Sequence, residues 1–329
     1  MDKKEDSIEF ITEIIPEIVH NRCFCEVGSR EFIEFDSVSI DKVSHPSEQI
    51  NDKSKRISDR KIELFRGKIV IKFSDEPKKF SVIIKLLGQQ IEEDDDDYKY
   101  FLNEEMFYNK MTLEYKLDIY PKVYVADMGR YGRPIIVIED LEAVSGYRRV
   151  DSKLDEDHLR ICLKAIARFH ARGLRLKYDK FNTFREFYAK LLDTNNIRDY
   201  DSHIKFINKI VQYVEEHPDL DKKVIKLFQD NVADCKHETE RRENEFLTIC
   251  HGDINLNNLI FRYENNKPTD VKIMDWGCMK YSLPGLDWQI INISKVGDDI
   301  LSGNIKEIFH NYLSVLVDEC PGIFDNILR

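Results

Sequence analysis

The sequence contains no hydrophobic run that is long enough to cross a membrane. Its apolar stretches, such as residues 135–138, are far shorter than the roughly 18 residues that a membrane-spanning helix needs. The N-terminus reads MDKKEDSIEF and has no apolar stretch after its basic residues, so it does not resemble a secretory signal. We therefore expect neither membrane insertion nor secretion.

Positive charge is scarce relative to negative charge. The 329 residues include 50 Lys and Arg but 61 Asp and Glu, which gives a net charge of -11 at pH 7. Nucleic acids and anionic membrane surfaces are bound through an excess of basic side chains. This composition therefore argues against both kinds of partner, and it says nothing about the oligomeric state.

Cysteine occurs in no pattern that predicts disulfide bonds or a zinc site. There are seven cysteines, an odd number, and only Cys23 and Cys25 lie close together. A single C-x-C pair does not supply the four ligands of a structural zinc site. We expect free thiols with structural roles in a protein of the reducing cytoplasm.

The order of predicted elements divides the chain into a β-rich first half and a helical second half. With 329 residues, of which 42% are hydrophobic, the chain can bury the cores of two lobes. We expect an α+β fold with an N-lobe over 1–139, a C-lobe over 140–329 and a hinge near 139–146. Hydrophobic periodicity predicts helices over 1–22, 100–111, from 157, through most of 183–246 and over 305–319, and strands within 31–90, at 120–127 and 133–141 and within 259–275.

The most specific signal is HGDINLNN at residues 251–258, followed by VKIMDWG at 271–277. Phosphoryl transfer needs a carboxylate that orients the acceptor hydroxyl, an amide oxygen on the metal and a second carboxylate that bridges the metal to the phosphates. A protein-kinase catalytic loop has the same Asp-to-Asn spacing and a later metal-binding Asp. We therefore interpret Asp253 as the catalytic residue, and Asn258 and Asp275 as ligands of Mg²⁺.

Asp275 ends an alternating run in which Val271, Ile273 and Asp275 are expected to share one strand face. A carboxylate on an apolar face is costly unless it meets a cation, and Mg²⁺ is the natural partner. The structural alternative is that HGD forms a capped turn and that Asp275 is an ordinary acid at the end of a strand.

A buried ion pair is predicted in the first half. Lys85 ends the apolar strand FSVIIK, and Glu104 lies in the middle of an apolar stripe on the following helix. Each charge needs an opposite charge in such a place, and kinases use a Lys–Glu pair of this kind to hold the nucleotide phosphates. The alternative is that Lys85 reaches solvent along its own stem and that Glu104 is a surface acid.

The strand PIIVI runs into Glu139-Asp140-Leu141, between the two motifs. This is where a kinase hinge presents backbone groups to adenine, so Glu139 and Leu141 are expected to contact the nucleotide. On its own, the segment is also consistent with the end of any buried strand.

These residues resemble the aminoglycoside phosphotransferase and choline kinase superfamily, and within it the ecdysteroid-kinase-like (CHK kinase-like) family of insects. The resemblance covers roughly residues 65–315. It implies a two-lobed protein-kinase-like fold and ATP- and Mg²⁺-dependent phosphorylation of a hydroxyl on a small molecule. It maps Lys85 to the phosphate-binding lysine and Glu104 to its partner. The matching segments are FLNEEMFY, IVIEDLEAVSGYRRVD, AIARFHA, HGDINLNNLIFRYENNKPTDVKIMDW and YSLPGLDW.

The same resemblance assigns structural roles to two further residues. His251 is implied to be a structural member of the catalytic loop, and Asp287 to be an acid that steadies this loop. The chain departs from the family at three points. The segment expected to cover the phosphates, roughly 36–68, has no glycine before Gly67, Asn255 stands where relatives commonly carry tryptophan, and the N-lobe is short.

Three functions remain open on this reading. The first is an active small-molecule kinase, and the second is a pseudokinase that binds ligands without turnover, which the glycine-free segment motivates. The third is a protein kinase, against which the absence of an A-P-E tripeptide after Asp275 argues.

The acceptor is weakly constrained, and the family points to ecdysteroids or hydroxylated xenobiotics. A steroid would need an apolar cleft. Aromatic residues at this spacing belong either to such a cleft or to the core, and they are Phe181, Phe184, Phe187, Tyr188, Phe206 and Tyr213.

Overall fold

The computed structural model describes residues 3–43, 61–74, 76–89, 91–143, 146–194, 247–294 and 304–322. The chain forms two compact units. Unit 1 comprises Met1–Asn109 and Pro121–Ser145, and unit 2 comprises Lys110–Tyr120 and Gly146–Arg329. The compact units therefore divide after Ser145, and a short segment of the first half belongs to unit 2.

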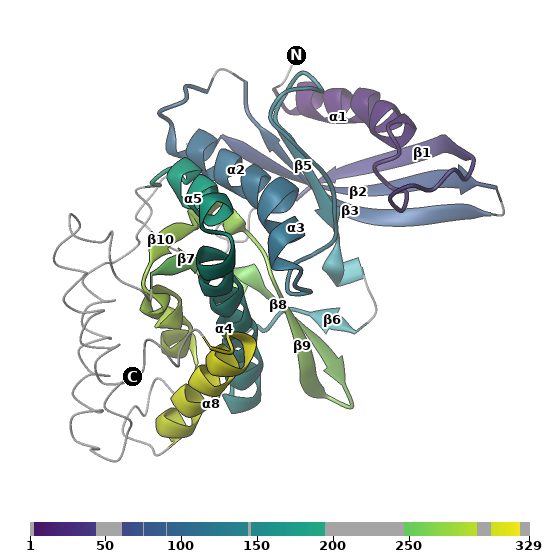
Figure 1. Ribbon diagram of the computed structural model, residues 1–329. Coiled ribbons are helices and arrows are strands. Elements are labelled where there is room, and N and C mark those ends of the chain that lie inside the picture. The colour runs from purple at the N-terminus through teal and green to yellow at the C-terminus, as the bar shows by residue number, and fades with distance from the viewer. Residues whose placement is uncertain are drawn as a thin grey trace. The chain divides into compact units, whose positions relative to one another are not determined.

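Unit 1 is built on a five-stranded antiparallel sheet with the order β1-β2-β3-β5-β4 (Figure 1). Alternate side chains of the central strands point to one face, as Phe65, Ile69 and Ile71 of β2 do, and these are fully buried. The strands are β1 (Ile33–Lys42), β2 (Ile62–Phe73), β3 (Pro77–Leu87), β4 (Val123–Asp127) and β5 (Ile135–Glu139).

The N-terminal helix α1 (Lys3–His20) covers this apolar face. Ile11, Ile15 and Ile18 are fully buried in one cluster with the inward side chains of the sheet. These isoleucines recur at helical spacing on one face, and the helix predicted over 1–22 is confirmed for Lys3–His20.

The helix α2 (Asp96–Met106) contacts β3. It begins in an acidic run, where the side chain of Asp95 accepts a hydrogen bond from the Asp97 backbone N–H and caps the first turn. A five-residue π-helical segment, Phe107–Met111, continues it, and α3 (Thr112–Tyr115) follows in unit 2. Glu104 and Phe101 of α2 are both buried.

Unit 2 is organised around the long helix α4 (Glu156–Asp179), which Asp155 caps through the His158 backbone N–H. The predicted apolar stripe of α4 is buried, from Leu159 to Phe169. The helix packs against α5 (Phe181–Lys190), α8 (Asn304–Glu319), β7 and β9. The strands of unit 2 are β6 (Tyr147–Arg148), β7 (Thr248–Cys250), β8 (Leu259–Glu264), β9 (Lys267–Ile273) and β10 (Lys280–Ser282), and they form the sheets β6-β8-β9 and β10-β7.

The α+β fold class is confirmed: unit 1 holds the antiparallel sheet, and the described part of unit 2 is mainly helical. The short strands β7 and β10 were not predicted. The helical prediction for 183–246 is confirmed only for α5, because residues 195–246 lie outside the described ranges. The same holds for residues 44–60, which include most of the glycine-free segment.

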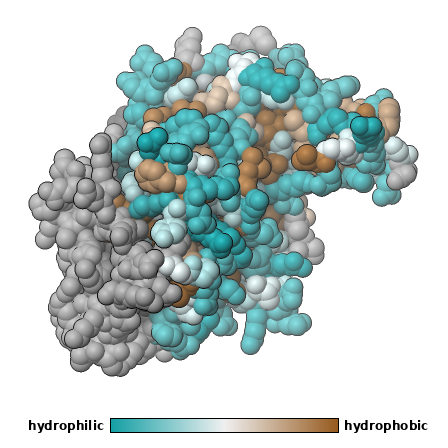
Figure 2. Space-filling view, in the orientation of Figure 1, coloured by the Kyte–Doolittle hydropathy of each residue, from teal (hydrophilic) through white to brown (hydrophobic). Residues whose placement is uncertain are grey.

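Two expectations from composition can be compared with the structure. All six cysteines in the described ranges are free, as predicted. None of the described helices is both long enough and apolar enough to span a bilayer. The face shown in Figure 2 is mainly hydrophilic, with hydrophobic side chains in small separate groups.

The packing of α1 predicts a stability effect. Replacing Ile15 with alanine should leave a cavity against the sheet and lower the free energy of unfolding by about 2–5 kcal/mol. Urea unfolding followed by circular dichroism measures the shift in midpoint. Glu13→Ala, on the exposed side of the same helix, should change it little, and an equal shift for both variants would contradict the packing.

Candidate active site

The loop 251–258 follows β7 directly, and its path depends on Gly252. This residue has φ +84°, and a Cβ atom there would lie 2.1 Å from the backbone oxygen of Cys278. Only glycine avoids both problems. The close approach arises because β7 pairs with β10, with Lys280 opposite Cys250. The glycine of HGD therefore lets the loop turn beside the segment that follows Asp275.

A buried carboxylate holds the start of this loop. Asp287 is completely buried and lies in the 3₁₀ segment Pro284–Ile293. Its Oδ2 accepts the His251 backbone N–H at 2.7 Å, and its Oδ1 accepts the Gly252 N–H at 2.8 Å. Burial alone would raise its pKa, but hydrogen bonds and charge interactions, first those of His170, lower the pKa below its usual value. Asp287 therefore stays ionised at neutral pH, and its contact with the loop, implied by the resemblance, is confirmed.

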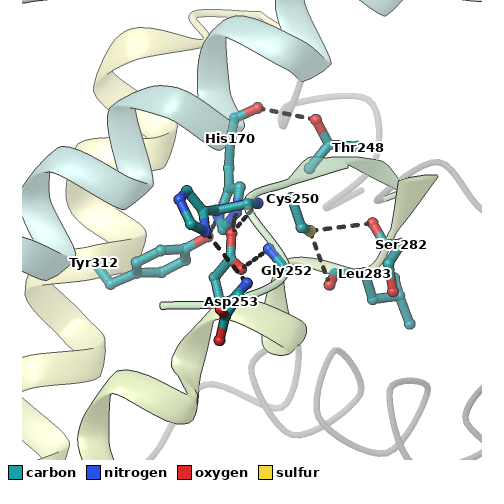
Figure 3. Close-up of polar contacts among 10 residues, drawn as sticks. His170, Thr248, Cys250, Gly252, Asp253, Ser282, Leu283 and Tyr312 are labelled. Carbon is teal, nitrogen blue, oxygen red and sulfur yellow. Dashed lines mark hydrogen bonds and ion pairs between the residues drawn. The ribbon is translucent and has the colours of Figure 1, made fainter. Parts of the chain in front are cut away.

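His170 and Tyr312 complete the support of Asp287 (Figure 3). His170 Nε2 lies 3.0 Å from Asp287 Oδ2, and His170 Nδ1 lies 2.6 Å from the Tyr312 hydroxyl oxygen. The ionised carboxylate can only accept, so Nε2 carries a proton and donates it to Asp287; in the neutral ring, Nδ1 then accepts from the Tyr312 hydroxyl. A continuous buried chain of hydrogen bonds thus runs from Tyr312 in α8, through His170 in α4, to the loop.

His170, Asp287 and Cys250 also form a possible metal-binding group among the described residues. Burial raises the pKa of the Cys250 thiol well above its usual value. Its Sγ–H donates to the backbone oxygens of Leu283 and Ser282, on the side away from Asp253 (Figure 3). Because a protonated thiol is a poor ligand and the other two side chains are hydrogen-bonded to each other, we interpret the group as structural.

His251 ties two parts of the loop region together. Its Nδ1 accepts the Asp253 backbone N–H at 3.2 Å, so its Nε2 must carry the proton and donates to the Met274 oxygen at 3.0 Å. Both ring nitrogens are used in this way. The structural role implied for His251 is therefore confirmed.

The pairing of β8 with β9 brings the two expected metal ligands to the same end of a sheet. Leu259 pairs with Ile273, and the Met274 N–H bonds the Asn258 backbone oxygen at 2.9 Å. Asn258 and Asp275 are the residues that flank this end. The Asn258 side chain donates its Nδ2 to the Asp253 backbone oxygen at 2.9 Å, so its Oδ1 points elsewhere. The amide oxygen of Asn258 and the carboxylate of Asp275 are both ligand types that Mg²⁺ accepts.

The prediction that Asp275 shares a strand face with Val271 and Ile273 is wrong. Strand β9 ends at Ile273, and Asp275 has a left-handed backbone conformation with φ +72°. The alternation of the sequence continues for two residues past the strand, and the next residue, Trp276, is fully buried in the core. The strained conformation at a half-buried acid is a mark of functional sites.

In unit 1, the predicted ion pair is present. Lys85 Nζ lies 2.8 and 2.7 Å from the two carboxylate oxygens of Glu104, and the two residues are 8% and 1% exposed. Strand β3 and helix α2 position them. Lys85 points to the face of β3 opposite Ile84, which lies in the α1 cluster. The pairing is confirmed, and the binding of phosphates by Lys85 stays a prediction.

The segment expected to contact adenine is fixed by several bonds. The Glu139 N–H bonds the Lys122 oxygen at 2.8 Å, and the Asp140 N–H bonds the Ser81 oxygen at 3.0 Å. Leu141 is buried and begins a short 3₁₀ turn, Leu141–Ala143. The predicted nucleotide contacts of Glu139 and Leu141 are not tested by these bonds and stay predictions.

Sequence reasoning missed two arginines that hold the candidate site segments. Arg66 of β2 forms 2.7 Å ion pairs with Asp140 and Glu142 at the expected hinge. Arg149 donates a hydrogen bond to the backbone oxygen of Asn257 in the loop 251–258. The sequence had a signal only for Arg149, which lies in the quoted segment GYRRVD.

The aromatic residues suggested for an acceptor cleft are placed in four different ways. Phe184 and Phe187 are buried in the core, and Phe181 is 51% exposed. Tyr188 stacks on Tyr281 with ring centroids 4.6 Å apart. Phe206 and Tyr213 lie outside the described residues.

The sequence matches the family model of the ecdysteroid kinase-like family over residues 63–322. No curated protein has a significant match to it. Among solved structures, an ethanolamine kinase of Plasmodium vivax is 15% identical, with a TM-score of 0.41 and coverage of 84% of this chain and 75% of that chain.

Two aminoglycoside phosphotransferase structures are also similar. A ternary complex of APH(2")-IIa with streptomycin and ATP is 12% identical, with a TM-score of 0.33 and coverage of 76% of this chain and 88% of that one. A GDP complex of aminoglycoside 2'-phosphotransferase-IIIa is 15% identical, with a TM-score of 0.33 and coverage of 84% and 86%. With TM-scores below 0.5, none of these likenesses supports a conclusion about this chain.

The buried Lys85–Glu104 pair predicts a non-additive stability effect. Lys85→Met should lower the free energy of unfolding by about 3–5 kcal/mol, because Glu104 is left buried without its cation. The double variant Lys85→Met/Glu104→Met should recover most of this loss. Urea midpoints of the single and double variants measure the effect. Lys190→Met, in the exposed pair with Glu186, should change stability little, and additive losses in the double variant would contradict the prediction.

The Asp287 network predicts a pH-dependent stability difference. Asp287→Asn should lower the free energy of unfolding by roughly 2–4 kcal/mol at pH 7, because an amide cannot accept all three hydrogen bonds. A carboxylate with a lowered folded-state pKa stabilises the fold above its unfolded pKa of about 3.9 and loses this effect at lower pH. The difference in the free energy of unfolding between the wild type and Asp287→Asn should therefore be constant between about pH 7 and 5 and become smaller below about pH 4. Urea midpoints across this range measure the gap, and one that widens on acidification would be evidence against the ionised state.

Proposed function

The chain belongs to the ecdysteroid kinase-like family, and from this premise we propose that it is an ATP-dependent phosphotransferase that phosphorylates a hydroxyl group of a small molecule. The observation that carries the proposal is the catalytic loop: Asp253 and Asn258 project from a segment whose backbone is fixed by Asp287 and His251. Such rigid positioning is what phosphoryl transfer requires of a protein.

We assign binding of the nucleotide phosphates to Lys85. Glu104 holds the ammonium group through two short hydrogen bonds, so Lys85 is presented in one orientation. The backbone of Glu139 and Leu141 is proposed to contact adenine, and Arg66 keeps this segment in place through Asp140 and Glu142. The functional division into a nucleotide-binding part over 1–139 and a catalytic part over 140–329 belongs to the same proposal.

Asn258 and Asp275 are proposed to hold Mg²⁺. When bound, this ion would neutralise negative charge on the phosphate oxygens. The donor set fits the ion, since it consists of an amide oxygen whose nitrogen is already engaged and a half-buried carboxylate.

Asp253 is proposed to orient the acceptor. Its carboxylate accepts the hydrogen bond of the acceptor hydroxyl and takes up the proton as the oxygen bonds to the terminal phosphorus of ATP. The products are then ADP and the phosphorylated acceptor. His251 and Asp287 act only on the backbone around Asp253, so we give them positioning roles.

For the acceptor, we propose an ecdysteroid or a hydroxylated xenobiotic, on the support of the family description alone. A pseudokinase that binds these molecules without turnover is the alternative, and the glycine-free stretch before Gly67 favours it. The net charge of -11 supports the expectation of no nucleic-acid partner and no membrane surface. The free thiols support a cytoplasmic location.

An acceptor screen tests the proposed function. The purified protein is incubated with Mg²⁺, ATP and separate pools of ecdysteroids, hydroxylated xenobiotics, choline and an aminoglycoside, and products are read by mass spectrometry. The proposal predicts a gain of one phosphoryl group on an ecdysteroid or xenobiotic hydroxyl. Absence of product together with absence of ATP binding would favour the pseudokinase.

The role proposed for Asp253 predicts how a substitution there changes turnover. Asp253→Asn should lower kcat by about 10²–10⁴-fold, because the amide cannot accept the proton. The affinity for ATP and the thermal stability should be nearly unchanged, since the Asp253 side chain is half-buried and supports no other described element. Turnover is measured by coupled ADP release, and wild-type turnover in the variant would remove Asp253 from the mechanism.

A further inference from the structure

Asn255 lies two residues after Asp253 and contacts its carboxylate. The Asn255 Nδ2 atom is 3.0 Å from Asp253 Oδ1 and 3.3 Å from the Asp253 backbone oxygen. The backbone of Asn255 is extended, with φ -140° and ψ 170°, and the residue caps the short 3₁₀ turn Leu256–Asn258. The same side chain therefore serves both the turn and the neighbouring carboxylate.

The cap fixes which way the amide points. The Asn257 backbone N–H, which can only donate, lies 2.9 Å from Asn255 Oδ1. The oxygen of the amide must therefore face the turn, and the NH₂ group must face Asp253. Reversing the amide would set two donors against each other at the cap and two acceptors against each other at Asp253.

The contact with Asn255 involves one of the two oxygens of the Asp253 carboxylate. Within the described part of the chain, Asn255 is the residue that hydrogen-bonds this carboxylate, and it does so at Oδ1. The other oxygen, Oδ2, is the atom left to meet a ligand. Asn258 bonds the backbone of Asp253 instead, so it does not orient the carboxylate.

We propose that Asn255 is a positioning residue for the transfer reaction: it holds Oδ1 of Asp253 so that Oδ2 faces the acceptor hydroxyl. This inference rests on the proposed function. The Asn255 side chain bonds Asp253 and Asn257, and it offers a neutral donor to the carboxylate that we assign to the acceptor. We therefore expect its effect to fall on kcat and not on the KM for ATP. A free carboxylate rotates about its side-chain bonds, and the amide restricts that rotation.

Three variants separate the two roles of Asn255. Asn255→Ala removes both the cap and the donor. Asn255→Ser keeps a good capping oxygen but has no group long enough to reach the Asp253 carboxylate. Asn255→Asp keeps the capping oxygen at the right length and replaces the donor with a second negative oxygen beside Asp253.

Turnover, KM for ATP and melting temperature are measured for each variant. We expect a lower melting temperature for Asn255→Ala and a melting temperature close to that of the wild type for Asn255→Ser. The kcat of Asn255→Ser should nevertheless be about 10-fold below that of the wild type, with an unchanged KM for ATP. The loss in kcat should be greater for Asn255→Asp, because the two carboxylates repel each other. Wild-type kcat in Asn255→Ser would show that Asn255 is only a cap, and would overturn the inference.

Crystal structures of the wild type and Asn255→Ser give a readout without turnover. The inference predicts one Asp253 rotamer in the wild type and a rotated or divided carboxylate in the variant. An unchanged Asp253 rotamer in Asn255→Ser would overturn the inference even with an inactive wild type. An inactive wild type that fails on every acceptor contradicts the proposed function, and in that case the two structures still decide what Asn255 does.

Discussion

The buried carboxylate of Asp287 is the interaction on which the candidate site depends. It accepts hydrogen bonds from the backbone N–H groups of two consecutive residues, His251 and Gly252, and this arrangement sets the direction of the chain as it enters the loop 251–258. An ionised side chain with no exposed surface is costly, and the hydrogen bonds it accepts offset that cost. Because the His170–Tyr312 pair lies behind it, three elements distant in sequence must pack correctly before the loop takes its shape.

In unit 1, the buried charges of Lys85 and Glu104 are likewise stabilised by the groups they contact. Lys85 and Glu104 are each unfavourable in an apolar setting and become tolerable together, on β3 and α2. Pairs of this kind are weak evidence for stability, since two apolar residues would serve as well. Their retention on these elements is better explained by a task that needs a positioned cation, which is the role proposed for Lys85.

Much of the site could be predicted from the sequence because its signals are local. Asp253, Asn258 and the Lys85–Glu104 pair follow from spacing within a loop or from periodicity on a strand and a helix. The conformation of Asp275 could not be predicted, because the alternating pattern of VKIMD continues past the point where β9 ends. Tyr312 lies 142 positions from His170, and strands of three residues such as β7 are too short for periodicity to show. Asn255 was noticed only as a departure from the family, and its contact with Asp253 required the geometry of the turn.

Metal-dependent nucleotide binding is the central proposal, with Mg²⁺ assigned to Asn258 and Asp275 and the nucleotide phosphates to Lys85. Calorimetric titration with a non-hydrolysable ATP analogue tests this most directly, in Mg²⁺ and in EDTA, for the wild type and for Asp275→Ala. We expect the wild type to bind the analogue in Mg²⁺, and we expect a markedly lower affinity in EDTA and in Asp275→Ala. No binding at millimolar nucleotide, or equal binding under all conditions, would contradict it.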